Sequence, residues 1–312
     1  MGNFCDVWAY LIHLSTNMWK QHQDAGFSRQ LTTEEETWDE IIDFLPSQGV
    51  NTVVIDVGDG VQYESHPEIS VAGAWSKDKM KKKLDQIRSL GMTPIPKLNF
   101  SAGHDGWLGI YSYMLSTPEY YKVCGDLIRE VAELFGNPAL FHLGMDEETA
   151  GNQAAYGLVR VRQKDLLWHD MNYLFDLCDQ VGAQPWVWSD HCCRNREDFL
   201  KNMSRSVLQS NWYYGKIFRN PDGTYPDRDI EVFEILDKAG FDQVLTCSVV
   251  FGNTKCAEQV MQLAKDVLTP EQVKGFIATP WFRTQSTELY AHLHEAHRFG
   301  TARKEVFPEI TK

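Results

Sequence analysis

The sequence lacks any long apolar run, and it has only one dense cluster of basic residues. None of its apolar stretches approaches the roughly 20 residues that a membrane-spanning helix needs. The formal net charge of −13 disfavours nucleic acid and acidic polyanions as partners, because phosphate binding needs clustered Lys and Arg. The one Lys-rich run, residues 77–83, has Met80, Leu84 and Ile87 at helical core spacing, so we interpret it as a solvated helix face. We therefore expect neither a membrane nor nucleic acid as a partner.

Features of disulfide-rich secreted proteins are also missing. Seven cysteines are an odd number for a disulfide framework in a chain of 312 residues. Cys192 and Cys193 are adjacent, unlike the cysteine pairs two residues apart that are typical of zinc sites, so we expect no structural metal. The first residues, 1–4, do not have the basic and apolar segments of a secretory signal peptide. Free thiols and a cytoplasmic location are the resulting expectations.

Length and composition favour one globular unit. A chain of 312 residues is long for an average domain but lies within the range of an α/β barrel that folds as one unit. Hydrophobic residues make up 43% and charged residues 23%, as in ordinary globular proteins. There is no linker, low-complexity tract or internal repeat. We expect residues 1–312 to form a single catalytic domain.

Short β-rich runs alternate with longer helical patterns, the order expected of a parallel sheet covered by helices. The eight candidate strands are Asp6–His13, Thr52–Val57, Thr93–Phe100, Leu140–Met145, Gln184–Ser189, Val207–Trp212, Gln243–Val249 and Phe276–Trp281. Glycines that could be left-handed C-caps follow five helical stretches, at positions 49, 91, 136, 182 and 240. An open doubly wound sheet would produce part of this alternation, but eight strands favour a closed (β/α)8 barrel.

Chemistry in such a barrel gathers at the C-terminal ends of the strands. The strand ends here carry acids, histidines, aromatic residues and one asparagine, namely Asp56, Asp59, Asn99, His104, Asp146, Glu147, Asp190, His191, Trp212, Tyr213 and Trp281. Asp146 and Glu147 directly follow the apolar fourth strand. Because adjacent side chains at a strand end point in different directions, one carboxylate can act as general acid while the other orients a neighbouring group. A solvated acidic loop is the alternative interpretation.

The motif His142-x-Gly144-x-Asp146-Glu147 resembles the signature of family 20 glycoside hydrolases, the β-N-acetylhexosaminidases. Their catalytic domain is a (β/α)8 barrel with this motif on its fourth strand. Weaker likeness extends to residues 96–104, 186–190, 208–212 and 278–281.

The resemblance implies a role for each acid of the motif. Glu147 is then the general acid and later the general base. Asp146 orients the 2-acetamido group of the substrate, which itself acts as the nucleophile. Neither an enzymic nucleophile nor a metal or organic cofactor is needed, and the seventh strand, residues 244–251, ends without an acid.

Further strand-end residues are candidates for sugar binding. Aromatic rings bind the apolar faces of sugars, so the candidate pocket lining is Trp188, Trp212, Tyr213 and Trp281, with barrel packing as the alternative. The polar candidates are Asn99, His104, His142 and Asp190; His104, Asp190 and His191 could equally satisfy backbone groups or orient an acid. We interpret Trp107 as either a lid or a surface-packing residue.

The sequence departs from the family pattern in several places. The first strand ends at His13 without the family's sugar-gripping Arg, and Lys97 and Asn99 replace the third-strand acids. The Tyr-x-Asp of the seventh strand and the acid after the eighth-strand Trp are also absent. Two alternatives therefore stay open. One is a non-catalytic carbohydrate-binding barrel, against which the intact Asp146-Glu147 pair argues. The other is a metal-dependent isomerase or hydrolase with ligands from Asp56, His104, Asp146, Glu148, Asp190 and His191.

Overall fold

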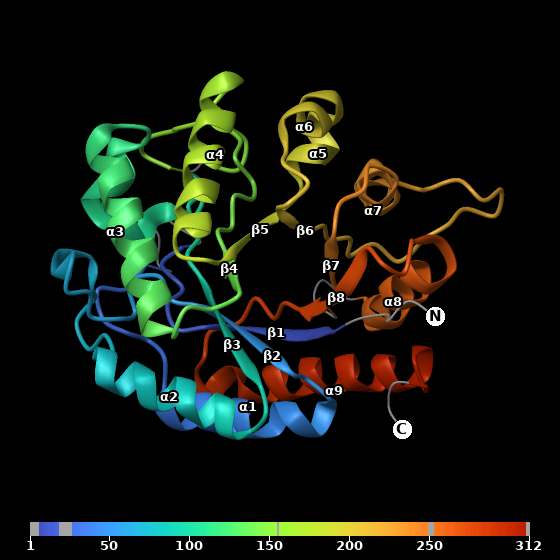
Figure 1. Cartoon of the computed structure of the whole chain (residues 1–312). Helices are drawn as coiled ribbons and strands as arrows, with labels where there is room; N and C mark the ends of the chain where they lie inside the picture. The colour runs from blue at the N-terminus through green and yellow to red at the C-terminus, as the bar shows by residue number, and fades with distance from the viewer. Residues whose placement is uncertain (1–5, 19–26, 155, 249–252, 310–312) are drawn as a thin grey trace.

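The computed structural model describes residues 6–18, 27–154, 156–248 and 253–309. Eight parallel strands form a closed barrel in the order β1 to β8 (Figure 1). The strands are β1 (Val7–His13), β2 (Thr52–Asp56), β3 (Thr93–Lys97), β4 (Leu140–His142), β5 (Gln184–Trp188), β6 (Leu208–Ser210), β7 (Gln243–Thr246) and β8 (Val273–Ala278). The predicted barrel is therefore confirmed.

Helices surround the sheet, with α1, α2 and α9 along one side and α3 and α4 standing together on another (Figure 1). The α-helices are α1 (Glu35–Phe44), α2 (Lys77–Ser89), α3 (Pro118–Leu134), α4 (Asp165–Gln180), α5 (His191–Arg194), α6 (Arg196–Asn202), α7 (Arg228–Lys238), α8 (Cys256–Val267) and α9 (Leu289–Val306). Short 3₁₀ helices are η1 (Leu45–Gln48), η2 (Pro67–Ile69), η3 (Asp105–Met114) and η5 (Ser286–Glu288). Among the described residues, no helix is both long and apolar enough to cross a membrane.

Several predicted boundaries differ from those observed. β8 begins at Val273, three residues before the predicted start. β4 ends at His142, because Gly144 and Met145 have positive φ angles and cannot continue a strand. The predicted end of the seventh strand, Val249, lies outside the described residues. All five predicted C-cap glycines have φ between 75° and 79°.

The Lys-rich run lies on α2, as predicted, but not all of it is solvated. Lys83 is buried and its ammonium contacts the Asp39 carboxylate of α1 at 2.7 Å. Lys79 pairs in the same way with Glu35 at 2.6 Å. These ion pairs join α1 to α2, so part of the run serves helix packing.

The interior of the barrel changes from apolar to polar along the strands. Its lower layer is apolar and consists of Ala9, Leu11, Val54, Ile95, Trp186, Leu208, Val244 and Ile277. Side chains two residues apart on a strand share a face, and two residues further along stand His13, Asp56 and Lys97, which are paired in register. His142 of β4 continues this row. The polar chemistry is therefore concentrated at the C-terminal end of the barrel.

The contact between β8 and β1, here called the seam, depends on Gly275. It pairs with Val7, and a Cβ at this position would overlap the Val7 carbonyl oxygen. We expect Gly275→Ala to lower the free energy of unfolding by about 3 kcal/mol, because the two backbones must separate. Urea denaturation measures this loss. The control is Gly151→Ala, where the nearest atom would be 3.8 Å away. Equal midpoints for the two variants would contradict this description of the seam.

Candidate active site

The segment after β4 has an unusual backbone. Gly144, Met145 and Glu147 have φ angles of 72°, 69° and 54°, in the left-handed region that non-glycine residues rarely adopt. A Cβ at Gly144 would overlap the side chain of Asn99, so this position requires glycine. Through this turn, the carboxylates of Asp146 and Glu147 both reach one imidazole.

That imidazole belongs to His104, which follows β3. Its Nε2 lies 3.3 Å from Asp146 Oδ2 and 3.3 Å from Glu147 Oε2. Its Nδ1 lies 3.2 Å from the Met18 carbonyl oxygen. Burial would lower the pKa of His104, but the charges of the two carboxylates and their hydrogen bonds raise it to about 10. His104 is therefore a cation at neutral pH, with both carboxylates against its Nε2.

Asp146 is held as an anion. Burial would raise its pKa, but the charge and hydrogen bond of His104, together with Lys97 and Asn99, keep that pKa well below the usual range. Asn99 Nδ2 donates to Asp146 Oδ1 at 2.8 Å. The side chain of Asp146 is 13% exposed, whereas that of Glu147 is 38% exposed. Asp146 is thus a fixed charge, and Glu147 is open to an incoming molecule.

Asp190, just after β5, holds the backbone of Glu147 with its side chain. Asp190 Oδ2 accepts a hydrogen bond from the Glu147 N–H at 3.1 Å. Burial raises the pKa of Asp190 to about 7, with a further contribution from Asp146 and an opposing one from Arg194. Asp190 therefore fixes the backbone of the neighbouring acid and titrates near neutrality.

Beneath the acids lies the polar row of the barrel interior. The Lys97 ammonium contacts the Asp56 carboxylate, and His13 Nδ1 lies 3.7 Å from the same carboxylate. His142 Nδ1 accepts a hydrogen bond from the Gly144 N–H at 3.0 Å, which supports the left-handed turn. Burial, followed by the charge of Lys97, places the pKa of His142 well below its usual value.

The three predicted tryptophans form one aromatic cluster. The ring of Trp188 lies 6.0 Å from Trp212, 6.1 Å from Trp281 and 4.5 Å from His142. Trp188 is buried, whereas Trp212 and Trp281 are half-buried. Trp281 also stacks on His13. This cluster places an aromatic wall beside the polar row.

Two other aromatic candidates, Tyr213 and Trp107, form hydrogen bonds or ring contacts with residues outside this cluster. Tyr213 donates to the Ile217 carbonyl and packs on Phe218, while its neighbour Tyr214 accepts a hydrogen bond from Trp281 Nε1 at 3.2 Å. Sequence reasoning missed Tyr214. Trp107 is 1% exposed and donates to the Asn99 carbonyl at 2.8 Å, so it packs inside the protein and is no lid.

Within the described part of the chain, the group of side chains that could hold a metal ion is His104, Asp146 and Glu147. One ligand atom from each lies within 4.8 Å of the others. The other ligands considered from the sequence do not join this group. Asp56 pairs with Lys97 and Glu148 with Arg162, while His191 lies 3.9 Å from Asp198.

Known structures provide the comparison, since no protein-family model and no curated protein matches the sequence. An exo-β-N-acetylglucosaminidase from Vibrio harveyi, in complex with N-acetylglucosamine, is similar to the whole chain, with a TM-score of 0.65 and 14% identity. A Flavobacterium johnsoniae chitobiase is similar over 96% of the chain, with a TM-score of 0.65 and 17% identity. A mutant Streptomyces plicatus β-hexosaminidase, in complex with its product, is also similar over 96% of the chain, with a TM-score of 0.64 and 12% identity.

The protein has the fold of the family 20 catalytic barrel. At 12–17% identity, the likeness shows the fold alone. The chain spans 58%, 48% and 64% of these three longer proteins, respectively.

The charge of His104 can be tested directly. We expect Asp146→Asn to lower the pKa of His104 from about 10 toward or below 6.5, because one of the two carboxylates that raise it is neutralised. The ring resonances in a pH-dependent NMR titration report this value. Asp85→Asn, at an exposed site on α2, is the control. Unchanged titration of His104 in Asp146→Asn would contradict the ion-pair arrangement.

The same pKa sets the direction of a pH effect on stability. A folded-state pKa raised above the ordinary 6.5 stabilises the fold fully below pH 6.5, and this contribution is lost as the pH rises through about 10. We expect wild-type protein to lose stability over this range relative to His104→Gln, as measured by urea denaturation at several pH values. Parallel pH profiles for the two proteins would oppose this assignment.

Proposed function

We propose that residues 1–312 form one catalytic barrel that removes a terminal β-linked N-acetylhexosamine, or a close relative, from a carbohydrate with retention of configuration. Glu147 is the acid and base, and Asp146 orients the acetamido group. The observation that carries this proposal is the pairing of a half-buried, anionic Asp146 with a more open Glu147 at the same nitrogen of one charged imidazole. The likeness of the fold to family 20 barrels supports it.

Each group has a role in the proposed reaction. Bound substrate excludes water from Glu147 and favours its protonated form, which donates a proton to the glycosidic oxygen. At the same time the acetamido oxygen of the substrate attacks the anomeric carbon and the leaving group departs. Asp146 stabilises the positive charge that develops on the acetamido nitrogen. The cation of His104 stabilises the Glu147 carboxylate left after proton donation. Glu147 then removes a proton from the water that opens the cyclic intermediate.

Sugar recognition is assigned to the aromatic cluster. Trp212 and Trp281 are half-buried and can contact the apolar face of a sugar, with Trp188 behind them. Asn99, His142 and Asp190 were predicted as sugar-binding residues. Because their polar groups bond to residues 144–147, we propose that they act by holding this segment.

A metal-dependent hydrolase or isomerase is the second candidate. It is favoured by one observation, the closeness of the ligand atoms of His104, Asp146 and Glu147. A divalent ion in this group would supply the positive charge in place of the imidazolium and would bind substrate oxygens.

A panel of chromogenic β-glycosides, assayed with and without EDTA, separates the candidates. The proposal expects release from 2-acetamido sugars and not from the corresponding 2-hydroxy sugars, because only the acetamido group can act as nucleophile. EDTA should leave this activity unchanged. Loss of activity on chelation would favour the metal enzyme, and no release across the panel would favour a carbohydrate-binding barrel.

Glu147→Gln tests the acid. An amide of the same shape cannot donate the required proton, so we expect the turnover number to fall by about 10²–10⁴-fold while the folded structure and ligand binding persist. Steady-state kinetics and circular dichroism measure the two effects. Glu119→Gln, on the exposed start of α3, is the matched control. A Glu147→Gln enzyme with half the wild-type turnover would remove Glu147 from the mechanism.

A further inference from the structure

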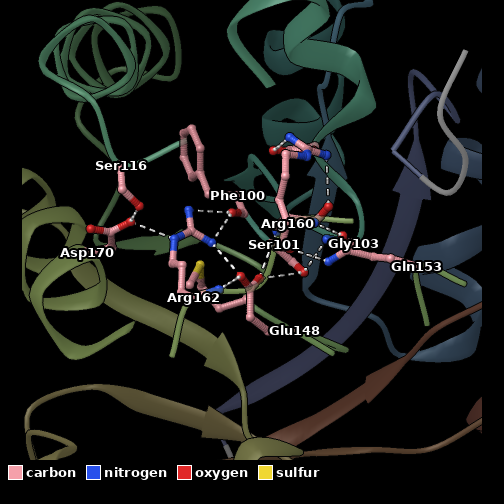
Figure 2. A network of polar contacts seen from close by, with 12 residues as sticks. Phe100, Ser101, Gly103, Ser116, Glu148, Gln153, Arg160, Arg162 and Asp170 are labelled. Atoms are coloured by element: carbon pink, nitrogen blue, oxygen red, sulfur yellow. Dashed lines mark hydrogen bonds and ion pairs between the residues drawn. The ribbon is translucent and has the colours of Figure 1, made fainter. Parts of the chain in front are cut away.

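Arg162 lies in the loop between β4 and α4, and its guanidinium is fully buried (Figure 2). Nε donates to Asp170 Oδ2 at 2.6 Å, Nη1 to Glu148 Oε1 at 3.0 Å and Nη2 to the Tyr120 hydroxyl at 2.9 Å. Both Nη atoms also donate to the Phe100 carbonyl at 3.3 Å. The five N–H groups of the guanidinium can all be used in this way. Lysine, with a single ammonium, cannot reproduce such a planar fork.

Glu148 links Arg162 to the acidic segment, residues 145–148 (Figure 2). Its Oε1 accepts from Arg162, while its Oε2 accepts from the Ala102 N–H at 2.8 Å and the Ser101 hydroxyl at 3.2 Å. The Ser101 hydroxyl also contacts the Asp146 carbonyl oxygen. Because Glu148 directly follows Glu147, its side chain fixes one end of the acidic segment to the loop that bears His104.

The acidic segment needs such support. Met145 and Glu147 have positive φ angles, and disfavoured conformations of this kind persist only where the surroundings hold them. Asp190 holds the Glu147 N–H on one side. On the other side the support comes from Glu148, whose own carboxylate is 4% exposed and is neutralised by Arg162.

We infer that Arg162 is a positioning residue, which acts through Glu148 to hold Asp146 and Glu147 at their places beside His104. Its expected effect on turnover rests on the proposed function. Its effect on the placement of the two carboxylates does not, because that placement can be measured without a substrate.

A second buried arginine provides a matched control. Arg160 donates to both oxygens of Asp105 at 3.1 and 3.0 Å and to the Ala102 carbonyl at 3.1 Å. Its hydrogen bonds to described residues reach Asp105, Ala102 and Gln153, and none reaches residues 145–148. Arg160 thus stabilises the same loops without holding the acids.

The experiment compares Arg162→Lys, Glu148→Gln and Arg160→Lys with the wild type. The readouts are the thermal midpoint, the NMR titration of His104, and kcat and KM on a chromogenic 2-acetamido glycoside. For Arg162→Lys and Glu148→Gln we expect kcat to fall by on the order of 10²-fold, as for a displacement of about 1 Å. KM should change less than kcat, and the pKa of His104 should fall. Arg160→Lys should lower the thermal midpoint but leave kcat and the His104 titration near those of the wild type.

Two results would overturn the inference. One is an Arg162→Lys protein with the kcat and His104 titration of the wild type; the other is an equal loss of both in Arg160→Lys. If Arg162→Lys does not fold, Glu148→Gln decides by the same criteria. If the wild type hydrolyses no glycoside, the proposed function fails, and the His104 titration alone still decides whether Arg162 positions the carboxylates.

Discussion

At the end of β4, a left-handed turn brings two carboxylates within 3.3 Å of one imidazole nitrogen. Burial alone would favour a neutral histidine, but two adjacent anions outweigh it, and the cation in turn keeps Asp146 charged. The arrangement persists because hydrogen bonds hold the turn on several sides. These come from Asn99, His142, Asp190 and Glu148. The roles proposed for both acids depend on this geometry.

The barrel supplies the setting for that turn. Its lower interior is apolar, and the next layer carries His13, Asp56, Lys97 and His142. Lys97 stands where the family pattern has an acid, and it is buried against Asp56. The ammonium therefore adds positive charge beneath the acids and contributes to the low pKa of Asp146. The polar row thus lies beside the cluster of Trp188, Trp212 and Trp281 at one end of the barrel.

Sequence periodicity was enough to predict eight strands and the glycines between helices and strands, because both patterns are local. It was less successful for the side chains near strand ends. Tyr213 and Tyr214 lie beyond the end of β6, where strand alternation no longer decides which side chain contacts Trp281. Arg162 and Glu148 lie in an irregular loop without periodicity. Their pairing across 14 positions could be found only in three dimensions.

The central claim is that Asp146 acts on the substrate's own acetamido group, and a thiazoline analogue of the cyclic intermediate tests it most directly. Calorimetric titration should show tight binding to the wild type and much weaker binding to Asp146→Asn, because the charge that stabilises the ring is lost. Absence of binding to the wild type, together with covalent trapping by a fluorosugar that Asp190→Asn abolishes, would contradict the account and identify an enzymic nucleophile.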